Sequence, residues 1–172
     1  KVRAPAMKRI LSGIKPTGDL HLGNYFGAIR EHVRLQADGE TYYFIANYHA
    51  LTGLRDAEKF REYTRLTAVT YLASGLDPAR SVLFRQSDVP EVTELTWLLL
   101  TVTPVPMLEN AVSYKDHRDK GKAVEMGLMT YPVLMAADIL AQDSHVVPVG
   151  RDQVQHVEMA RDIAQKYNAE VR

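Results

Sequence analysis

Three segments of the sequence place glycine turns or helical patterns beside side chains that could bind a charged ligand. The first covers residues 13–24 (GIKPTGDLHLGN), where an apolar run ends, a Pro/Gly turn follows and a helical pattern opens. A helix N-terminus offers free N–H groups and a positive dipole end, which favour phosphate. Gly23 would let a ligand approach the backbone, and His21 and Asn24 could donate to phosphate oxygens. Taken alone, a glycine-bearing turn before a helix is more often only a turn.

The second segment is TYPVLMAADIL, residues 130–140. Tyr131, Met135 and Asp138 lie at positions i, i+4 and i+7, so they share one side of a helix. Tyrosine and methionine in such a stripe are usually core residues. A carboxylate among them is unusual, because an unpaired buried charge costs several kcal/mol. Asp138 therefore needs a hydrogen-bond donor, which could be a protein group or a ligand N–H.

The third segment is VPVGRDQVQH, residues 147–156, in which an apolar run meets Gly150 and a new helix. Asp152 could accept hydrogen bonds from ribose hydroxyls, as acidic groups at strand ends do in other nucleotide sites. It could equally be a helix N-terminal carboxylate, stabilised by about 0.3–1 kcal/mol. A further set of side chains is assigned to packing or to solvated polar positions: Trp97, His32, His49 and His145.

Short runs rich in β-branched and aromatic residues alternate along the chain with longer segments of helical periodicity. The expected strands are Arg9–Ile14, Thr41–Asn47, Ser81–Gln86 and His145–Val149. The expected helices are one from Leu22 through Val33, then Asp56–Ser74, Glu91–Thr101, Met107–His117, Val124–Gln142 and Asp152–Tyr167. The β-α-β-α-β order implies parallel strands joined by right-handed crossovers, which is the doubly wound α/β class.

The middle of the chain departs from this alternation. Prolines at 90, 104 and 106 divide apolar helical segments, and Asp116–Lys122 (DHRDKGK) is expected to be a charged loop. Pro132 should end or kink the helix that contains it. We therefore expect one α/β domain over residues 1–172, with a helical insertion at about 88–122.

Composition excludes several classes of protein. Lys+Arg and Asp+Glu are both 21, so a nucleic-acid contact would have to be a local patch or lie outside this chain. The chain has no cysteine and no HExxH motif, so neither a disulfide nor a protein metal site is expected. No apolar run approaches the roughly 20 residues that span a bilayer, and KVRAPAMKR lacks the apolar region of a signal peptide. The expected location is cytoplasmic.

Taken together and in this order, the segments resemble the tryptophanyl-tRNA synthetases of the class I family. HLGN at residues 21–24 matches the HIGH signature, with asparagine in the last position. SGIKPTGDLHLGNYFGA, QSDVPEV, TYPVLMAADIL and VPVGRDQVQH all look like segments of this family, and the resemblance runs nearly end to end. HLGN alone is weak evidence, but the ordered set is specific. It implies a Rossmann-like doubly wound parallel sheet with a helical insertion.

The resemblance also implies an activity. The family activates L-tryptophan with ATP to tryptophanyl-adenylate, with Mg²⁺ bound to the ATP, and transfers the aminoacyl group to tRNA(Trp). A homodimer is expected by the same analogy. Neither a KMSKS sequence nor a helical anticodon-binding domain is found in the chain, and we expect both to lie downstream of Arg172.

The same resemblance assigns roles to individual residues. Catalytic roles are expected for Lys15, His21 and Asn24. The ATP site would comprise Lys15, Pro16, Thr17, His21, Gly23, Asn24, Gly150, Arg151 and Asp152. The tryptophan site would comprise Tyr131, Met135, Asp138, Val147, Val149 and Gln153, with Asp138 accepting the indole N–H. Family members often have Gln in place of Lys15 and Phe in place of Leu11, which affects the charge near the triphosphate and the pocket shape.

Three alternatives remain at this stage. A tyrosine-type ligase shares the architecture but uses Tyr, Gln and Asp on the specificity helix, whereas this chain has Met135 in the middle. A thioether packs well on a flat ring but is a poor hydrogen-bonding group, so Met135 favours tryptophan. A nucleotidyltransferase that does not act on tRNA is disfavoured by the specificity helix. A non-catalytic ATP- or tryptophan-binding fragment would be distinguished by the sequence beyond Arg172.

Overall fold

The computed structural model describes residues 7–18, 20–121 and 123–171. Strands β1 (Arg9–Ile14), β2 (Glu40–Ile45) and β3 (Ser81–Arg85) form a parallel sheet in the order β1-β2-β3. The first half of the helical structure is α1 (Leu22–Asn24), the π-helix η1 (Tyr25–Ile29), α2 (Arg30–Leu35), α3 (Asn47–Ala50) and α4 (Ala57–Ala73). The second half is the 3-10 turn η2 (Gln86–Asp88), α5 (Glu91–Leu100), α6 (Val105–Glu109), α7 (Val112–Asp119), α8 (Met126–Ala141), the 3-10 turn η3 (Arg151–Gln153) and α9 (Val154–Glu170).

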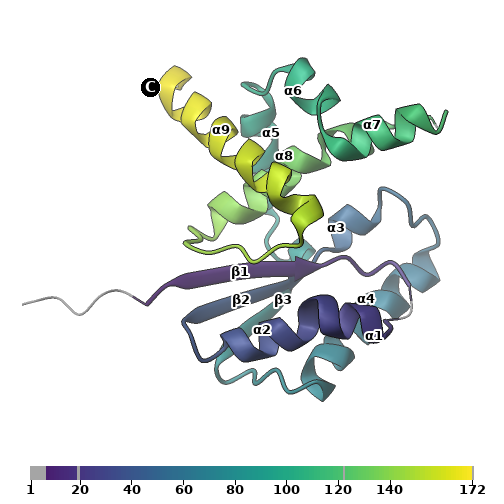
Figure 1. Cartoon of the computed structure of the whole chain (residues 1–172), viewed down its shortest axis with the longest axis vertical. Coiled ribbons are helices and arrows are strands. Elements are labelled where there is room, and N and C mark those ends of the chain that lie inside the picture. The colour runs from purple at the N-terminus through teal and green to yellow at the C-terminus, as the bar shows by residue number, and fades with distance from the viewer. Residues whose placement is uncertain (1–6, 19, 122, 172) are drawn as a thin grey trace, which may run out of the picture.

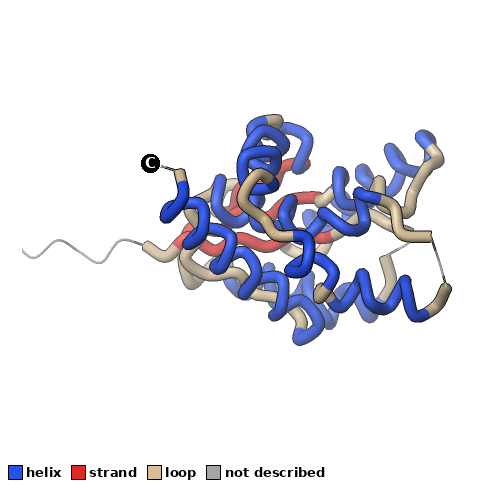
Figure 2. Tube along the Cα trace, turned by 90° about the horizontal axis from the view of Figure 1, so that it is seen from above, coloured by secondary structure: helices blue, strands red, loops and turns tan. Residues whose placement is uncertain are grey.

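Helices cover both faces of the sheet, which confirms the doubly wound α/β class. Figure 1 shows α1, α2 and α4 below the strands and α5 to α9 above them. Seen from above in Figure 2, the upper helices lie across the strands. Successive side chains of β2 pack on opposite faces of the sheet, because side chains alternate along a strand. Tyr43 packs with Tyr71 of α4 below, whereas Phe44 packs with Leu11 and Ile139 above.

The upper layer has its own core, in which α8 packs against α5 and α9. Val133, Ala136 and Ala137 of α8 are fully buried there, and the two alanines allow neighbouring helices to approach closely. Helix α8 continues through Pro132 to Ala141, which agrees with the long helix expected over Val124–Gln142 despite this proline. A proline removes one backbone hydrogen bond, and the buried packing of this helix retains its helical path.

Three expectations from the sequence are corrected. The helix after HLGN contains a π-turn at Tyr25–Ile29, a feature that is frequent at functional sites. The expected helix Met107–His117 is two helices, since Ala111 between them has extended backbone. The expected charged loop is helical as far as Asp119, where Lys120 and Asp116 form an i,i+4 ion pair of 2.7 Å. Lys122 lies outside the described residues.

The expected strand His145–Val149 forms only one parallel bridge, between Ile10 and Val146. Pro148 has no backbone N–H, so the ladder cannot continue past this point. Instead, the Pro148 carbonyl accepts a hydrogen bond of 3.1 Å from the Ser12 hydroxyl. The segment therefore lies along the outer edge of β1 without completing a fourth strand. The assignment of residues 88–122 as an insertion into one catalytic domain stays a prediction.

Below the sheet, His32 lies in a buried aromatic stack with Tyr43 and Tyr71. Its ring centroid is 4.8 Å from that of Tyr43, and its Nδ1 atom is 2.9 Å from the Tyr71 hydroxyl. Burial disfavours the charged imidazolium and lowers the pKa of His32 from 6.5 to about 4, although nearby Glu31 opposes the shift. The fold thus holds a neutral histidine at physiological pH.

Because its pKa is lowered in the folded state, His32 should make the free energy of unfolding decrease as the pH falls. The unfolded state binds a proton near pH 6.5 and the folded state only near pH 4, so the contribution of His32 is complete above pH 6.5 and is lost between these values. The loss amounts to about 3 kcal/mol. We expect urea unfolding of wild type and His32→Gln to diverge in pH dependence over this window. Parallel curves from pH 7 to 4 would contradict the assignment.

Candidate active site

The three strands end in register, which places the residues that follow them at one edge of the sheet. Ile14 pairs with Ile45, and Ile45 pairs with Arg85. Lys15 and Gln86 directly follow β1 and β3, and helix α3 follows β2 after Ala46. Ligands of doubly wound sheets bind at the carboxyl ends of strands, so this edge is where a site is expected.

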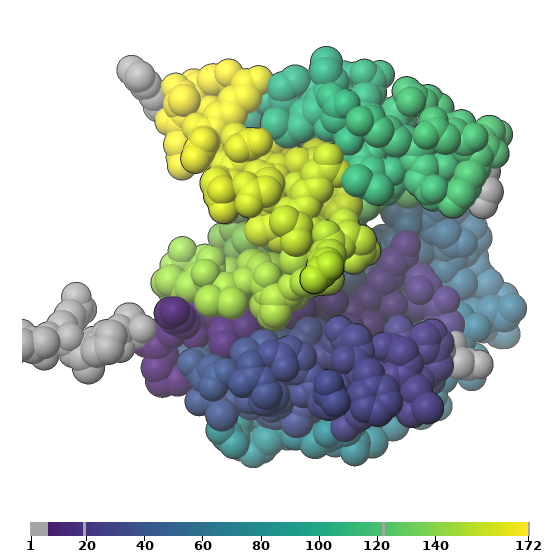
Figure 3. All heavy atoms as spheres, viewed as in Figure 1, coloured from purple at the N-terminus to yellow at the C-terminus, as the bar shows by residue number. Residues whose placement is uncertain are grey.

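A cavity of about 560 Å³ opens at this edge, between the sheet, helix α8 and the segment from Val147 to Gln153. Figure 3 shows the surface hollowed where the upper helices meet the lower layer. The volume is within the roughly 300–1,000 Å³ of small-molecule sites. The cavity is lined by eight of the residues expected from the sequence: Lys15, Tyr131, Met135, Asp138, Val147, Val149, Gly150 and Gln153. Leu11 and Phe44 also line it and pack together, so an aromatic ring stands beside the leucine that replaces the usual phenylalanine.

The remaining expected residues are not part of the cavity lining. These are Pro16, Thr17, His21, Gly23, Asn24, Arg151 and Asp152. Pro16 is buried, whereas Thr17, His21, Arg151 and Asp152 are exposed. The helical segment opened by HLGN nevertheless reaches the cavity one turn later, through Gly27, Ala28 and Glu31. The structure therefore gathers the expected tryptophan residues around one cavity, while most of the expected ATP residues lie outside its lining.

The HLGN residues cap their own helix. The His21 Nδ1 atom accepts the Gly23 N–H at 3.1 Å, and the Asn24 side-chain oxygen accepts the His21 N–H at 3.0 Å. A Cβ at Gly23 would lie 2.8 Å from the His21 ring, so the glycine makes room for the imidazole. Because Nδ1 is an acceptor, the His21 ring proton is on Nε2 and is available as a donor to a ligand.

Lys15 is held at the cavity by a neighbouring loop. Its ammonium donates to the Thr52 hydroxyl at 2.9 Å, and that hydroxyl donates to the His49 carbonyl at 2.8 Å. Although much of the side chain is exposed, partial burial of the ammonium lowers the pKa of Lys15 from its ordinary value. A positive charge therefore stands at the end of β1, in contact with the loop that follows α3.

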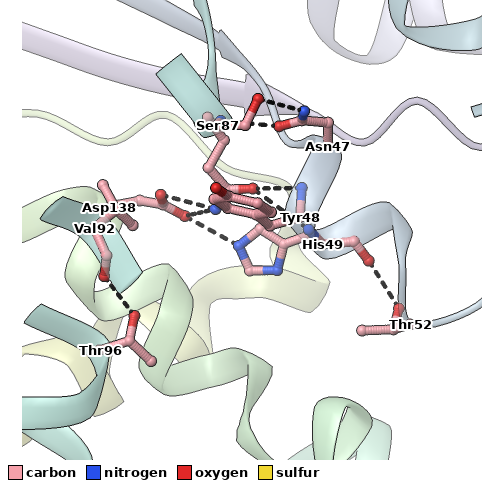
Figure 4. A network of polar contacts seen from close by, with 9 residues as sticks. Asn47, Tyr48, His49, Thr52, Ser87, Val92, Thr96 and Asp138 are labelled. Atoms are coloured by element: carbon pink, nitrogen blue, oxygen red, sulfur yellow. Dashed lines mark hydrogen bonds and ion pairs between the residues drawn. The ribbon is translucent and has the colours of Figure 1, made fainter. Parts of the chain in front are cut away.

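Asp138 is only 4% exposed, and the protein itself supplies donors to its carboxylate. The His49 Nε2 atom lies 3.0 Å from Oδ2, and the Gln86 amide nitrogen lies 2.9 Å from both oxygens. Figure 4 shows the His49 ring and the labelled Asp138 side chain facing one another. Burial raises the pKa of Asp138, while the contacts with His49 and Gln86 oppose that shift. The sequence left open whether the donor to Asp138 is a protein group or a ligand N–H. In the structure, His49 and Gln86 already supply protein donors.

A chain of hydrogen bonds fixes the orientation of the Tyr131 hydroxyl. The Gln153 amide nitrogen donates to the Asp152 carboxylate at 2.8 Å, which turns its oxygen toward His156. The His156 Nδ1–H donates to that oxygen at 3.0 Å, so its Nε2 accepts from Tyr131 at 3.0 Å. Burial lowers the pKa of His156, in keeping with a neutral ring. Tyr131 therefore donates its proton to His156, and its oxygen is left as an acceptor beside Ser113 at the cavity wall.

No functional role was expected from the sequence for four residues that organise this site: His49, Thr52, Gln86 and His156. His49 was assigned to packing or to a solvated position, yet it lines the cavity and contacts Asp138. Gln86 could have been found, since it directly follows β3 as Lys15 follows β1. His156 stands one helical turn after Gln153, which was a weaker signal.

Comparison with known proteins agrees with this geometry. Residues 6–172 match the family described as tRNA synthetases class I (W and Y). The chain belongs to this family. It is 60% identical over 162 residues to the tryptophan–tRNA ligase of Fusobacterium nucleatum, covering 94% of the chain and 50% of that protein. It is 58% identical over 160 residues to that of Rhodopirellula baltica, covering 93% and 50%.

A solved structure of the same family is also similar. The tryptophanyl-tRNA synthetase of Campylobacter jejuni, complexed with ADP and tryptophan, has a TM-score of 0.89 and 54% identity, covering 94% of this chain and 51% of that one. The chain thus spans about half the length of the relatives it matches. No helix within the described residues is long and apolar enough to cross a membrane.

The hydrogen-bond directions predict opposite tautomers for two histidines. His156 should carry its proton on Nδ1, because Gln153 offers an oxygen there, and His21 should carry it on Nε2. Two-bond ¹H–¹⁵N spectra near pH 7.5 would distinguish the two forms. Replacing Asp152 by Ala should weaken the preference of His156 and leave His21 unchanged. An Nε2–H form of His156 in the unmodified protein would be incompatible with the proposed orientation of Tyr131.

Proposed function

We propose that this chain is the ATP- and tryptophan-binding part of a tryptophan–tRNA ligase. The observation that carries the proposal is the shared lining of one cavity by Met135 and Asp138, a ring-packing thioether beside a buried acceptor. An indole needs both an apolar surface and an acceptor for its N–H. The similarity to curated tryptophan–tRNA ligases at 58–60% identity supports the same assignment.

The polar groups around the cavity suit an amino acid. Tyr131 presents lone pairs and would accept from the α-ammonium group, with the Gln153 side chain beside it. Val147 and Val149 supply apolar wall for the ring. The Campylobacter jejuni relative was solved with tryptophan and ADP, which supports placing both ligands here.

ATP would lie where the HLGN helix, Lys15 and the Gly150 turn converge. The His21 Nε2–H, the Asn24 amide and the Lys15 ammonium are donors for phosphate oxygens. Gly150, the Arg151 backbone and Asp152 would hold adenosine, while Pro16, Thr17 and Gly23 would shape the approach. Mg²⁺ would arrive bound to the triphosphate, as in other phosphoryl-group chemistry of ATP.

The reaction would be an in-line displacement. A carboxylate oxygen of tryptophan forms a bond to the α-phosphorus of ATP, and the bond from that phosphorus to the bridging oxygen breaks and releases pyrophosphate. A hydroxyl of the tRNA 3′-terminal ribose then attacks the acyl carbon and AMP leaves. The residues named above position the reactants and stabilise phosphate charge, which is the main protein contribution to such chemistry.

The proposed partners are tRNA(Trp) and a second copy of the chain, in the cytoplasm. Trp97 and Leu98 of α5 are 69% and 45% exposed, which supports an interface at this helix. The KMSKS loop and the anticodon-binding domain of such a ligase would belong to sequence beyond residue 172. A tyrosine-type ligase remains the nearest alternative, and a binding fragment without catalysis is the alternative from another class.

Amino-acid-dependent ATP–pyrophosphate exchange tests the proposed activity. We expect exchange with tryptophan and little with tyrosine, because Met135 cannot hydrogen-bond a phenol well. The exchange rate should be about 10²- to 10³-fold lower without the KMSKS loop than in a chain extended to include it, since the loop would supply transition-state contacts. Tyrosine-dependent exchange would favour the tyrosine-type reading. Binding of both substrates with no exchange in the extended chain would favour a non-catalytic module.

The assignment of Asp138 is tested by two substitutions. Asp138→Asn keeps the size but removes the charge, and Asp138→Ala removes the acceptor as well, so both should weaken tryptophan binding, Ala more than Asn. The affinity for ATP alone should stay near that of wild type. Calorimetric titration of each ligand measures both. Equal loss of ATP and tryptophan affinity would mean that the carboxylate only maintains the fold.

A further inference from the structure

We propose that Gln86 is the positioning residue that orients Asp138 for reading the indole N–H. This inference rests on the proposed function and adds a residue that the proposed function does not itself use. Gln86 lies in η2, directly after β3, and is 1% exposed. Its amide joins the carboxylate of α8 to the N-terminus of α3.

The direction of the Gln86 amide is set by its neighbours. Its oxygen accepts the backbone N–H of Tyr48 at 3.0 Å, an interaction that an amide nitrogen could not make. The NH₂ group is therefore turned toward Asp138, where it lies 2.9 Å from each carboxylate oxygen. Because the amide is anchored at both ends, it fixes the plane of the carboxylate.

The contacts differ between the two carboxylate oxygens. Oδ2 accepts from both His49 and Gln86, whereas Oδ1 contacts Gln86. A carboxylate has about four lone-pair sites, so Oδ1 retains capacity for a further donor. Asp138 lines the cavity, and a ligand N–H is the donor that the cavity can supply. Gln86 thus holds the acceptor in one orientation before the ligand arrives, which lowers the ordering cost of binding.

A purely structural role for Gln86 can be tested against a matched neighbour. Ser87 and Asn47 join the same two elements, because the Asn47 amide donates to the Ser87 hydroxyl at 2.8 Å and the Ser87 N–H donates back at 3.1 Å. Figure 4 shows this pair above Tyr48 and apart from the contact between Asp138 and His49. A change at Ser87 weakens the junction of η2 with α3 and leaves the contacts of Asp138 intact.

The experiment compares tryptophan with its analogue in which sulfur replaces the indole N–H, 3-(benzothiophen-3-yl)alanine. Wild type, Gln86→Met and Ser87→Ala are titrated with each amino acid and with ATP. We expect Gln86→Met to lose about 10- to 100-fold in tryptophan affinity but much less for the analogue, because only tryptophan uses the oriented acceptor. Ser87→Ala should keep the wild-type ratio of the two affinities, and ATP affinity should change little in either variant.

Equal losses for both amino acids in Gln86→Met, or the same change of ratio in Ser87→Ala, would overturn the positioning role.

A second measurement uses the unmodified protein, in case Gln86→Met does not fold. Tryptophan should shift the ¹H–¹⁵N side-chain signals of Gln86 strongly and the sulfur analogue weakly, and equal shifts would count against the proposal. If wild type binds no tryptophan, the proposed function itself fails. If wild type binds tryptophan and the sulfur analogue equally, Asp138 does not recognise the indole N–H. That outcome would contradict both the role of Asp138 and the positioning role of Gln86.

Discussion

A carboxylate buried at the centre of an apolar helical layer has to be paired, and the pairing of Asp138 organises much of this molecule. Its two protein donors come from the ends of two different strands, since His49 follows β2 and Gln86 follows β3. Satisfying one charge on α8 therefore ties the helical layer to two strand ends at once. Removing either donor would leave a buried charge underpaired, which costs more than a typical neutral hydrogen bond contributes.

The lower part of the site depends on the same short helix. In the first turn of α3, the Tyr48 N–H donates to the Gln86 side-chain oxygen, and the His49 side chain contacts Asp138. Thr52 follows the helix and accepts a hydrogen bond from the Lys15 ammonium. The groups proposed for the indole and for the phosphates are thus joined through a single helical turn. Such a connection would place the two bound ligands relative to one another, and positioning of this kind is a main protein contribution to displacement at phosphorus.

Sequence periodicity predicted the sheet well because buried strands and their crossover helices carry strong local signals. Arg9–Ile14 matches β1 at both ends, and the doubly wound class is confirmed. The failures have local causes. Pro148 breaks a ladder that the apolar run 145–149 otherwise favours, and extended backbone at Ala111 divides the helix expected over 107–117. Tertiary pairing of Asp138 could not be read from its own helix, since His49 and Gln86 are 89 and 52 residues away.

The single bridge between Ile10 and Val146 gives the cavity two walls of unequal stiffness. On the inner side, β1 is locked to β2 along its whole length, so the floor formed by Leu11 and Gly13 cannot yield without breaking a ladder. On the outer side, Val147 to Gly150 follows β1 with little more than the Ser12 hydroxyl to hold it beyond the bridge. Ligands of different width would then be accommodated by displacing the outer wall. A compliant wall would discriminate poorly by size, so selection among ligands would then fall to the polar atoms of helix α8.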